Sequence, residues 1–444
     1  MNNRKPFALY LHIPFCKRKC AYCDFLSFPA TKEAQERYCR LLCMEIEQAA
    51  TCYAAKYRIS TIFIGGGTPS FISPELIEMI MNRVKSLFSV DADAEISMEM
   101  NPGTLGMNTA ATSVRDDNAM RALEIYRRAG INRISIGLQS ADDKALKEIG
   151  RIHTYEDFLK TYDEVRTAGF DNVNIDLMAA LPDQSYEGYM DSLSKAIALS
   201  PEHLSCYSLI LEEGTPLYEN QEKYSFPDED TERKMYHDTV KVLKEAGYGH
   251  YEISNFAKPG RECRHNIVYW RRGDYLGLGL GASSCMNETR FKNPADMKLY
   301  EKMVNETDGY LKCERGKSTN GMLADNEIAE VKSADGKFMD SMNEKDNICT
   351  GLDFPRRPYL EEYQKLTEKD RIEETFFVGL RMMEGVDTEG FIISFGKTIE
   401  EVYGELPQKL IAEGLLERHQ DHISLTPYGI DISNYVMAQF IFDE

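Results

Sequence analysis

Three cysteines stand close together near the start of the chain, at Cys16, Cys20 and Cys23. Their spacing is C-x3-C-x2-C, and they follow an apolar run, residues 7–13, that is too short for a helix and reads as a strand. Three thiolates on one short loop can converge on an iron–sulfur cluster or on zinc. A four-iron cluster held by three cysteines keeps one iron open to a small molecule. The alternatives are a zinc site of three cysteines and His12, or cysteines that only fill a core.

Further polar and glycine residues stand where later strands are predicted to end. The second predicted strand, residues 60–64, runs into Gly65-Gly66-Gly67-Thr68, whose backbone could approach a ligand closely. Glu99 ends the third predicted strand, Gln139 the fourth, and Asp176 lies on the fifth. Ligands of parallel α/β sheets gather at the carboxyl ends of the strands, so we expect these side chains around one pocket.

The elements that position these residues alternate regularly up to about residue 212. Short β-branched or aromatic runs are separated by segments whose apolar residues recur at steps of three and four, which predicts six βα units with a parallel sheet and outer helices. The predicted strands are residues 7–13, 60–64, 95–100, 133–138, 172–178 and 203–211, and the predicted helices are residues 33–50, 74–88, 117–129, 155–168 and 186–199.

The rest of the chain divides into three further parts. We predict a core over residues 1–225 and an extension over 226–312, with a long helix at 228–247 and a Gly-rich run at 273–281. Residues 313–350 are polar and predict a peripheral insertion. Residues 351–444 predict a winged-helix-like α+β domain, with helices at 368–383 and 399–413 and a strand at 422–425.

The cysteine loop and the glycine turn together resemble the radical S-adenosylmethionine (SAM) superfamily. The matching segments are Cys-Lys-Arg-Lys-Cys-Ala-Tyr-Cys and Gly-Gly-Gly-Thr-Pro, one βα unit apart. The resemblance implies a partial (β/α)6 barrel that holds a [4Fe–4S] cluster on Cys16, Cys20 and Cys23, with SAM on its open iron. Its pattern over residues 7–290 is that of the coproporphyrinogen-oxidase-like branch. By this resemblance the SAM contacts are Tyr10, Tyr22, Gly66, Gly67, Thr68, Glu99, Gln139, Arg151, Asp176, Ile210 and Ala282.

A third motif favours one member of that branch. His265-Asn266-Ile267-Val268-Tyr269-Trp270 resembles the HNxxYW motif of the HemW-type haem chaperones, and Trp270 is the only tryptophan of the chain. This implies haem as a bound group, with His265 as its axial ligand and a Tyr/Trp pair against the flat macrocycle. Cys263 is the next candidate ligand. Alternatively, the tryptophan packs in the core and the histidine is an ordinary hydrogen-bonded residue.

The oxidase itself carries a further cysteine two residues after the third, whereas Phe25 stands there in this chain. The resemblance therefore favours a chaperone that delivers haem to an acceptor protein, and it assigns no catalytic residue. The alternatives are oxygen-independent coproporphyrinogen III oxidation, anaerobic haem opening by a radical SAM methyltransferase, or a zinc-stabilised barrel that binds a partner.

Composition limits the partners. The 444 residues carry a net charge of −20 at pH 7, which argues against nucleic acid and an anionic membrane surface as main partners. Eleven cysteines and no apolar run long enough to span a bilayer predict a cytoplasmic protein. The resemblance adds an electron donor of the flavodoxin or ferredoxin type, and a peripheral contact with a membrane-bound acceptor.

Overall fold

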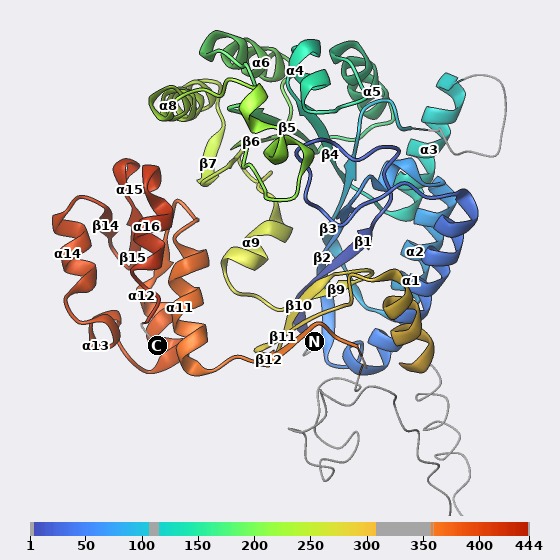
Figure 1. Ribbon diagram of the computed structural model, residues 1–444. Helices are drawn as coiled ribbons and strands as arrows, with labels where there is room; N and C mark the ends of the chain where they lie inside the picture. Colours follow the sequence, from blue (N-terminus) through green and yellow to red (C-terminus); the bar gives the residue numbers. More distant parts are fainter. Residues whose placement is uncertain (1–3, 106–114, 308–356, 358, 443–444) are drawn as a thin grey trace, which may run out of the picture.

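Six parallel strands form the centre of the protein. The computed structural model describes residues 4–105, 115–307, 357 and 359–442, and its strands β1 to β6 pair in chain order, each parallel to the next (Figure 1). This confirms the predicted α/β fold with a partial barrel. The strands are β1 (Lys5–Ile13), β2 (Tyr57–Gly66), β3 (Val90–Met100), β4 (Arg133–Gln139), β5 (Val173–Ala179) and β6 (His203–Ser208).

Helices connect these strands and cover the outer face of the sheet (Figure 1). The helices begin at residues that can cap them. At the start of α5, for example, the Thr154 hydroxyl and the Asp157 carboxylate form a capping box. Gly130 and Gly169, just after α3 and α5, have positive φ angles of 93° and 85°. The helices are α1 (Lys32–Tyr53), α2 (Pro74–Leu87), α3 (Arg115–Ala129), α4 (Asp143–Glu148), α5 (Tyr155–Thr167), α6 (Tyr186–Ala198), α7 (Pro216–Glu219) and α8 (Glu229–Glu245), with short 3₁₀ turns at Pro69–Phe71 and Gln221–Lys223.

The two faces of the six-stranded sheet differ in chemistry. Successive side chains of a strand point to opposite faces. On β2 and β3, Ile62, Ile64, Ile96 and Met98 belong to the apolar core. The alternate residues of the same strands face inward, and those of β3 to β6 are largely polar. They comprise Glu95, Ser97, Glu99, Arg133, Ser135, Asn174, Asp176, His203 and Ser205.

Additional strands extend the sheet at both ends. Strand β9 (Tyr275–Leu278) pairs in parallel with β1, so the Gly-rich run after residue 273 returns to the first strand of the barrel. The full order of this sheet is β12-β11-β10-β9-β1-β2-β3-β4-β5-β6-β8-β7. The added strands are β7 (Gly249–Glu252), β8 (Asn255–Ala257), β10 (Ser283–Met286), β11 (Thr289–Lys292) and β12 (Glu362–Lys365), and residues 297–307 are helical.

Helix α9 (Arg264–Trp270), which carries the third motif, lies on the inner face of the sheet. The carboxylate of inward-facing Glu95 accepts hydrogen bonds from the amide nitrogens of Arg264 at 3.0 Å and His265 at 3.1 Å. A carboxylate from β3 thus satisfies the first free N–H groups of this helix and fixes its start inside the barrel.

The C-terminal part has its own core, with Phe376 and Phe440 stacked at 4.1 Å between ring centres. Its three-stranded sheet has the order β13-β15-β14, in which β14 and the predicted strand at 422–425 form a short β ribbon and β13 is a third strand that was not predicted. The elements are α11 (Glu368–Gly379), β13 (Val386–Asp387), α12 (Thr388–Phe395), α13 (Ile399–Tyr403), α14 (Leu406–Ala412), β14 (Leu416–His419), β15 (His422–Leu425), α15 (Pro427–Asp431) and α16 (Ser433–Ala438).

The predicted division of the chain at residues 225, 312 and 350 stays a prediction. The insertion predicted at 313–350 lies outside the described residues, and β12 joins the large sheet just before the C-terminal module begins at α11. No helix in the described ranges is long and apolar enough to cross a membrane.

Candidate cofactor site

The cysteine loop leaves the carboxyl end of β1 and closes on itself. The amide of Phe28 donates to the carbonyl of Pro14 at 2.9 Å, and the amide of Cys16 donates to the carbonyl of Phe28 at 3.1 Å. The loop that holds Cys16, Cys20 and Cys23 is therefore tied at its base to the first strand. Cys16 is buried, whereas Cys20 and Cys23 are half-buried.

The three thiols suit a cluster better than a single ion. Among the described residues, no group of three or more His, Cys, Asp or Glu side chains is arranged to hold one metal ion. The three thiols that bind a [4Fe–4S] cluster can lie further apart than the ligands of a single ion, because each thiolate binds a different iron. Burial raises the pKa of Cys16 and of Cys23, and the charge of Cys20 raises both further.

His12 is poorly placed for the alternative zinc site. Its Nδ1 lies 3.0 Å from the hydroxyl of Tyr10, and its Nε2 lies 2.9 Å from the carbonyl oxygen of Leu26. Both ring nitrogens are therefore occupied, and the imidazole instead ties β1 to the far end of the cysteine loop. The geometry favours the cluster over a site of three cysteines and this histidine.

The glycine turn after β2 packs directly against the cysteine loop. The amide of Gly67 donates to the carbonyl of Ile13, and that of Thr68 to the carbonyl of Phe15, both at 2.8 Å. Gly66 has a φ of +111°, and a Cβ there would lie 2.4 Å from the ring of His12. Glycine is required at this position both by conformation and by space.

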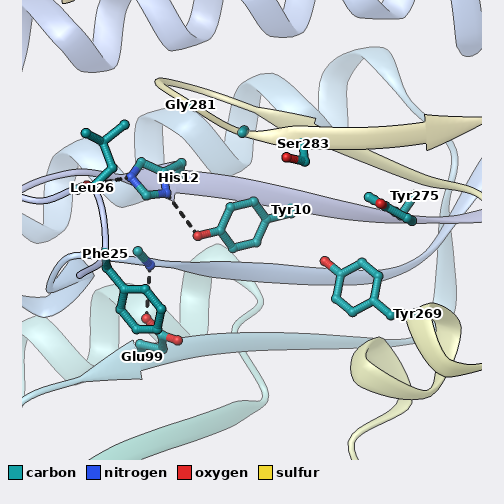
Figure 2. A pocket seen from close by; sticks show the side chains of 11 residues that line it. Tyr10, His12, Phe25, Leu26, Glu99, Tyr269, Tyr275, Gly281 and Ser283 are labelled. Carbon is teal, nitrogen blue, oxygen red and sulfur yellow. Dashed lines mark hydrogen bonds between the residues drawn. The ribbon is translucent and has the colours of Figure 1, made fainter. Parts of the chain in front are cut away.

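A cavity of about 410 Å³ opens beside this turn. Figure 2 shows that Tyr10 and His12 of β1, Glu99 of β3 and Tyr269 of α9 enclose it. Four predicted SAM contacts line the cavity: Tyr10, Gly66, Glu99 and Ala282. The other residues of its wall are Phe25, Leu26, Tyr275, Gly281 and Ser283, together with His12 and Tyr269.

Glu99 is the acidic group of the cavity. Its Oε2 accepts a hydrogen bond from the amide of Gly66 at 3.0 Å. Burial raises its pKa to about 7, with a further contribution from the charge of Asp176. A carboxylate in this environment gains most from a cationic ligand, because a positive charge offsets both effects.

Arg151 joins the cysteine loop to the strand ends. Its guanidinium donates to the Asn101 side-chain oxygen and to the carbonyl of Gly137, both at 2.6 Å, and lies 3.8 Å from the sulfur of Cys20. Asn101 in turn donates to the Thr68 hydroxyl at 2.7 Å, and that hydroxyl lies 3.4 Å from the sulfur of Cys16. The sequence analysis missed Asn101, although it lies two residues after Glu99.

The remaining predicted contacts lie outside the cavity wall. Asp176 accepts from the Asn174 amide at 2.7 Å, while the Gln139 side-chain oxygen accepts from the Tyr207 hydroxyl at 3.0 Å. Tyr22 packs against a small apolar cluster that includes Ile149 and Leu181. Ile210 lies beyond β6 with 69% of its surface exposed. The roles of these residues toward SAM stay predictions.

His265 is deeply buried at the barrel interior, with 1% of its surface exposed. Its Nδ1 lies 2.9 Å from the Thr61 hydroxyl and its Nε2 lies 2.8 Å from the Tyr269 hydroxyl. Burial and the nearby charge of Arg133 lower its pKa to about 3, so the imidazole is neutral. Axial ligation of haem iron by His265, which stays a prediction, requires that one of these two contacts be broken.

Trp270 faces the C-terminal module. The guanidinium of Arg381 lies over its ring at 4.5 Å, and the same guanidinium makes an ion pair with buried Glu252 at 3.2 Å. Cys263 is also buried, with its sulfur 3.6 Å from Glu95 and its pKa raised to about 12 by burial. In this arrangement neither side chain lines the cavity.

The polar inner face is the feature that the sequence analysis missed most completely. His203 is paired on both ring nitrogens, with Asn174 Oδ1 at 2.6 Å and the Tyr251 hydroxyl at 2.8 Å. Arg133 is 2% exposed among these groups. Polar residues at every second position of β3 to β6 were a visible signal, because a parallel sheet buried on both faces is otherwise almost wholly apolar.

The class of the protein follows from this fold and site. The family model of the radical SAM superfamily matches residues 10–196, and the family model of the HemN C-terminal domain matches residues 366–432. The structure of coproporphyrinogen III oxidase (HemN) from Escherichia coli superposes with a TM-score of 0.74 at 22% identity, covering 99% of this chain and 90% of that one. The protein is therefore a radical SAM protein, with the [4Fe–4S] cluster and SAM that define this class.

Two relatives define the family within that class. The heme chaperone HemW of Lactococcus lactis is 31% identical over 449 residues, covering 99% of both chains. The heme chaperone HemW of Escherichia coli is 41% identical over 278 residues, covering 62% of this chain and 69% of its own. The chain belongs to the HemW family.

Proposed function

We propose that this protein binds haem and delivers it to a haem-requiring acceptor protein. The observation that carries the proposal is the position of α9: the helix with the haem-chaperone motif reaches the cavity that predicted SAM contacts line, through Tyr269. Membership of the HemW family supports it, because the relatives are named for the same activity.

The cofactor site supplies the rest of the proposal. Cys16, Cys20 and Cys23 would hold the cluster, and three cysteine ligands would leave one iron open to SAM. Glu99 is placed to pair with a cationic part of SAM, and the backbone of Gly66 and Gly67 offers close approach. The cluster supplies one-electron chemistry when bound, which requires a reductant of the flavodoxin or ferredoxin type.

The proposal also includes the cellular location of the protein and the kind of acceptor that it serves. We place the protein in the cytoplasm, because the cysteines of the described ranges are free thiols, as expected in a reducing compartment. A membrane-bound acceptor would be reached by peripheral contact.

Haem titration of the anaerobically reconstituted protein tests the function. We expect about one haem per chain and its transfer to an apo-haemoprotein, which is measured by the absorption band of the acceptor. Coproporphyrinogen III is incubated in parallel with the cluster-loaded protein, SAM and a strong reductant. Conversion of coproporphyrinogen III would make the protein an oxidase, and absence of haem binding would overturn the proposal.

A further inference from the structure

A chain of hydrogen bonds crosses the polar inner face of the sheet. It begins at the amide of Cys263, the residue before α9, which donates to the Tyr251 hydroxyl at 3.2 Å. His203 follows, with its Nε2 2.8 Å from that hydroxyl and its Nδ1 2.6 Å from Asn174 Oδ1. The side-chain amide of Asn174 then donates to Asp176 Oδ1 at 2.7 Å. We call this chain the inner-face relay, and it joins the start of α9 to a carboxylate on β5.

The two ends of the relay fix the direction of every hydrogen bond in it. The backbone amide of Cys263 can only donate, and an ionised carboxylate at Asp176 can only accept. Burial lowers the pKa of His203 well below its usual range, so its imidazole is neutral and carries one proton. That proton lies on Nδ1, toward the oxygen of Asn174, and Nε2 accepts from the Tyr251 hydroxyl. All the donors of the relay therefore point toward Asp176.

The relay engages one oxygen of Asp176 and leaves the carboxylate with spare capacity. The hydroxyl groups of Ser135 and Ser205 also bond to this carboxylate, with Ser135 3.3 Å from Oδ2. An ionised carboxylate has about four acceptor positions, so it can take a further donor from a ligand. Ser135 lies opposite Glu99 in the pairing of β4 with β3, so one strand separates Asp176 from the acidic residue of the cavity.

Burial makes the relay rigid. Asn174 is 1% exposed and His203 is 0% exposed, and each uses every polar atom of its side chain in a hydrogen bond within the inner face. A fully satisfied buried network has one arrangement, because any rotation of a member leaves a polar group without a partner. The carboxylate at its end is thereby held in one orientation.

We propose that Asn174 and His203 are positioning residues for SAM, which hold the Asp176 carboxylate in the orientation that receives the cofactor. The inference rests on the SAM contact predicted for Asp176, and it is independent of haem binding. It adds to the predicted contacts two buried side chains that act on SAM through Asp176. The same relay gives the start of α9 a fixed connection to this contact.

The tautomer of His203 tests the direction of the relay in protein that holds neither cluster nor SAM. Nuclear magnetic resonance of protein with isotope-labelled histidines separates the two neutral tautomers by the shifts of the ring nitrogens. The signal of His203 is identified by its loss in His203→Leu. We expect the proton on Nδ1 at neutral pH. A proton on Nε2, or on both nitrogens, would overturn the inference.

SAM affinity tests the consequence. Calorimetric titration of the cluster-loaded protein compares wild type with Asn174→Leu, His203→Leu, Asp176→Asn and the double variant of Asn174→Leu with Asp176→Asn. We expect about a fivefold loss of affinity in Asn174→Leu and about a threefold loss in His203→Leu, with iron content unchanged. Asn174→Leu should add nothing in the Asp176→Asn background, because no carboxylate is left to position. A loss that came only from a weaker fold would be the same in both backgrounds.

Tyr189→Phe is the matched control. The Tyr189 hydroxyl lies 2.9 Å from that of Thr239, and its side chain is as buried as the relay, but it belongs to α6. This variant should lose stability and keep wild-type SAM affinity.

Two outcomes separate the inference from the contact on which it rests. Wild-type affinity in both relay variants, together with a loss in Asp176→Asn, would overturn the inference alone, as would equal losses from Asn174→Leu in both backgrounds. Wild-type affinity in Asp176→Asn would overturn the predicted contact and the inference with it. If Asn174→Leu loses its iron, His203→Leu in the same two backgrounds decides.

Discussion

The cysteine loop and helix α9 carry the two most recognisable motifs of the chain, and they use them in opposite ways. In the loop, Cys20 and Cys23 are half-buried and their thiols are accessible for metal binding. In the helix, His265 is buried with both ring nitrogens in contact, and Trp270 lies under Arg381 of the C-terminal module. The loop thus leaves two of its three thiols partly exposed, whereas the packed helix divides its motif residues between the cavity and the core.

The largest effect that this contrast predicts is at the loop. Cys16→Ala, Cys20→Ala or Cys23→Ala should abolish the brown chromophore and the bound iron after anaerobic reconstitution, because each thiolate holds one iron. Iron and sulfide analysis checks this, with about four of each expected in wild type. Cys52→Ala on α1 is the matched control and should keep its iron. Stoichiometric zinc in place of iron would contradict the cluster.

Helix α9 should respond through stability instead. Arg381→Met removes the partner of buried Glu252 and the cation over Trp270, and should lower the free energy of unfolding by about 2–3 kcal/mol while iron content stays intact. Denaturant unfolding measures the change.

Arg271→Met is the control for this experiment, since Arg271 pairs with Glu384 at the same junction but both side chains are exposed. Its cost should be below about 1 kcal/mol. If the two variants were equally stable, the contacts of Arg381 with Glu252 on β7 and with Trp270 on α9 would not anchor the C-terminal module.

A smaller effect is expected on the polar inner face of the sheet. Asp176→Asn should weaken SAM binding by about tenfold, because a charge-assisted hydrogen bond to the cofactor becomes a neutral one. Calorimetric titration of the cluster-loaded protein measures it. Asp171→Asn, at an exposed surface ion pair with Arg261, should bind SAM as wild type does. Unchanged affinity in Asp176→Asn would place the SAM contacts elsewhere.

The smallest effect is the pH dependence of stability that Glu99 contributes. Its pKa is raised to about 7 in the folded protein, so the folded state holds a proton that the unfolded state releases above about pH 4.5. Stability of the cofactor-free protein should fall between these values as pH rises, by about 1 kcal/mol once solvent in the cavity is allowed for. Glu99→Gln should flatten this part of the profile, and an identical slope in both proteins would argue against the raised pKa.

Much of the fold could be predicted from the chain alone. The six strands coincide with short β-branched runs that alternate with amphipathic helical segments. Each helix buries one apolar face against the outer side of the sheet, so its apolar residues recur with the period of a helix. The short helix α4 was not predicted, since a six-residue element carries too little periodicity. Helix α9 was recognised only as a motif, and its seven residues have capping groups contributed from β3, far away in the sequence.

The sequence by itself determined the chemistry that is available: the spacing of three thiols on one loop, a glycine turn one βα unit later, and polar residues at strand ends. These are properties of neighbouring residues, and the regular geometry of strands and turns carries them into space. Only the tertiary structure decided which residue of a motif faces the cavity. That choice depends on contacts between distant segments, such as Glu95 with the start of α9 and Arg381 with Trp270, which turn Tyr269 toward the cavity and leave His265 behind it.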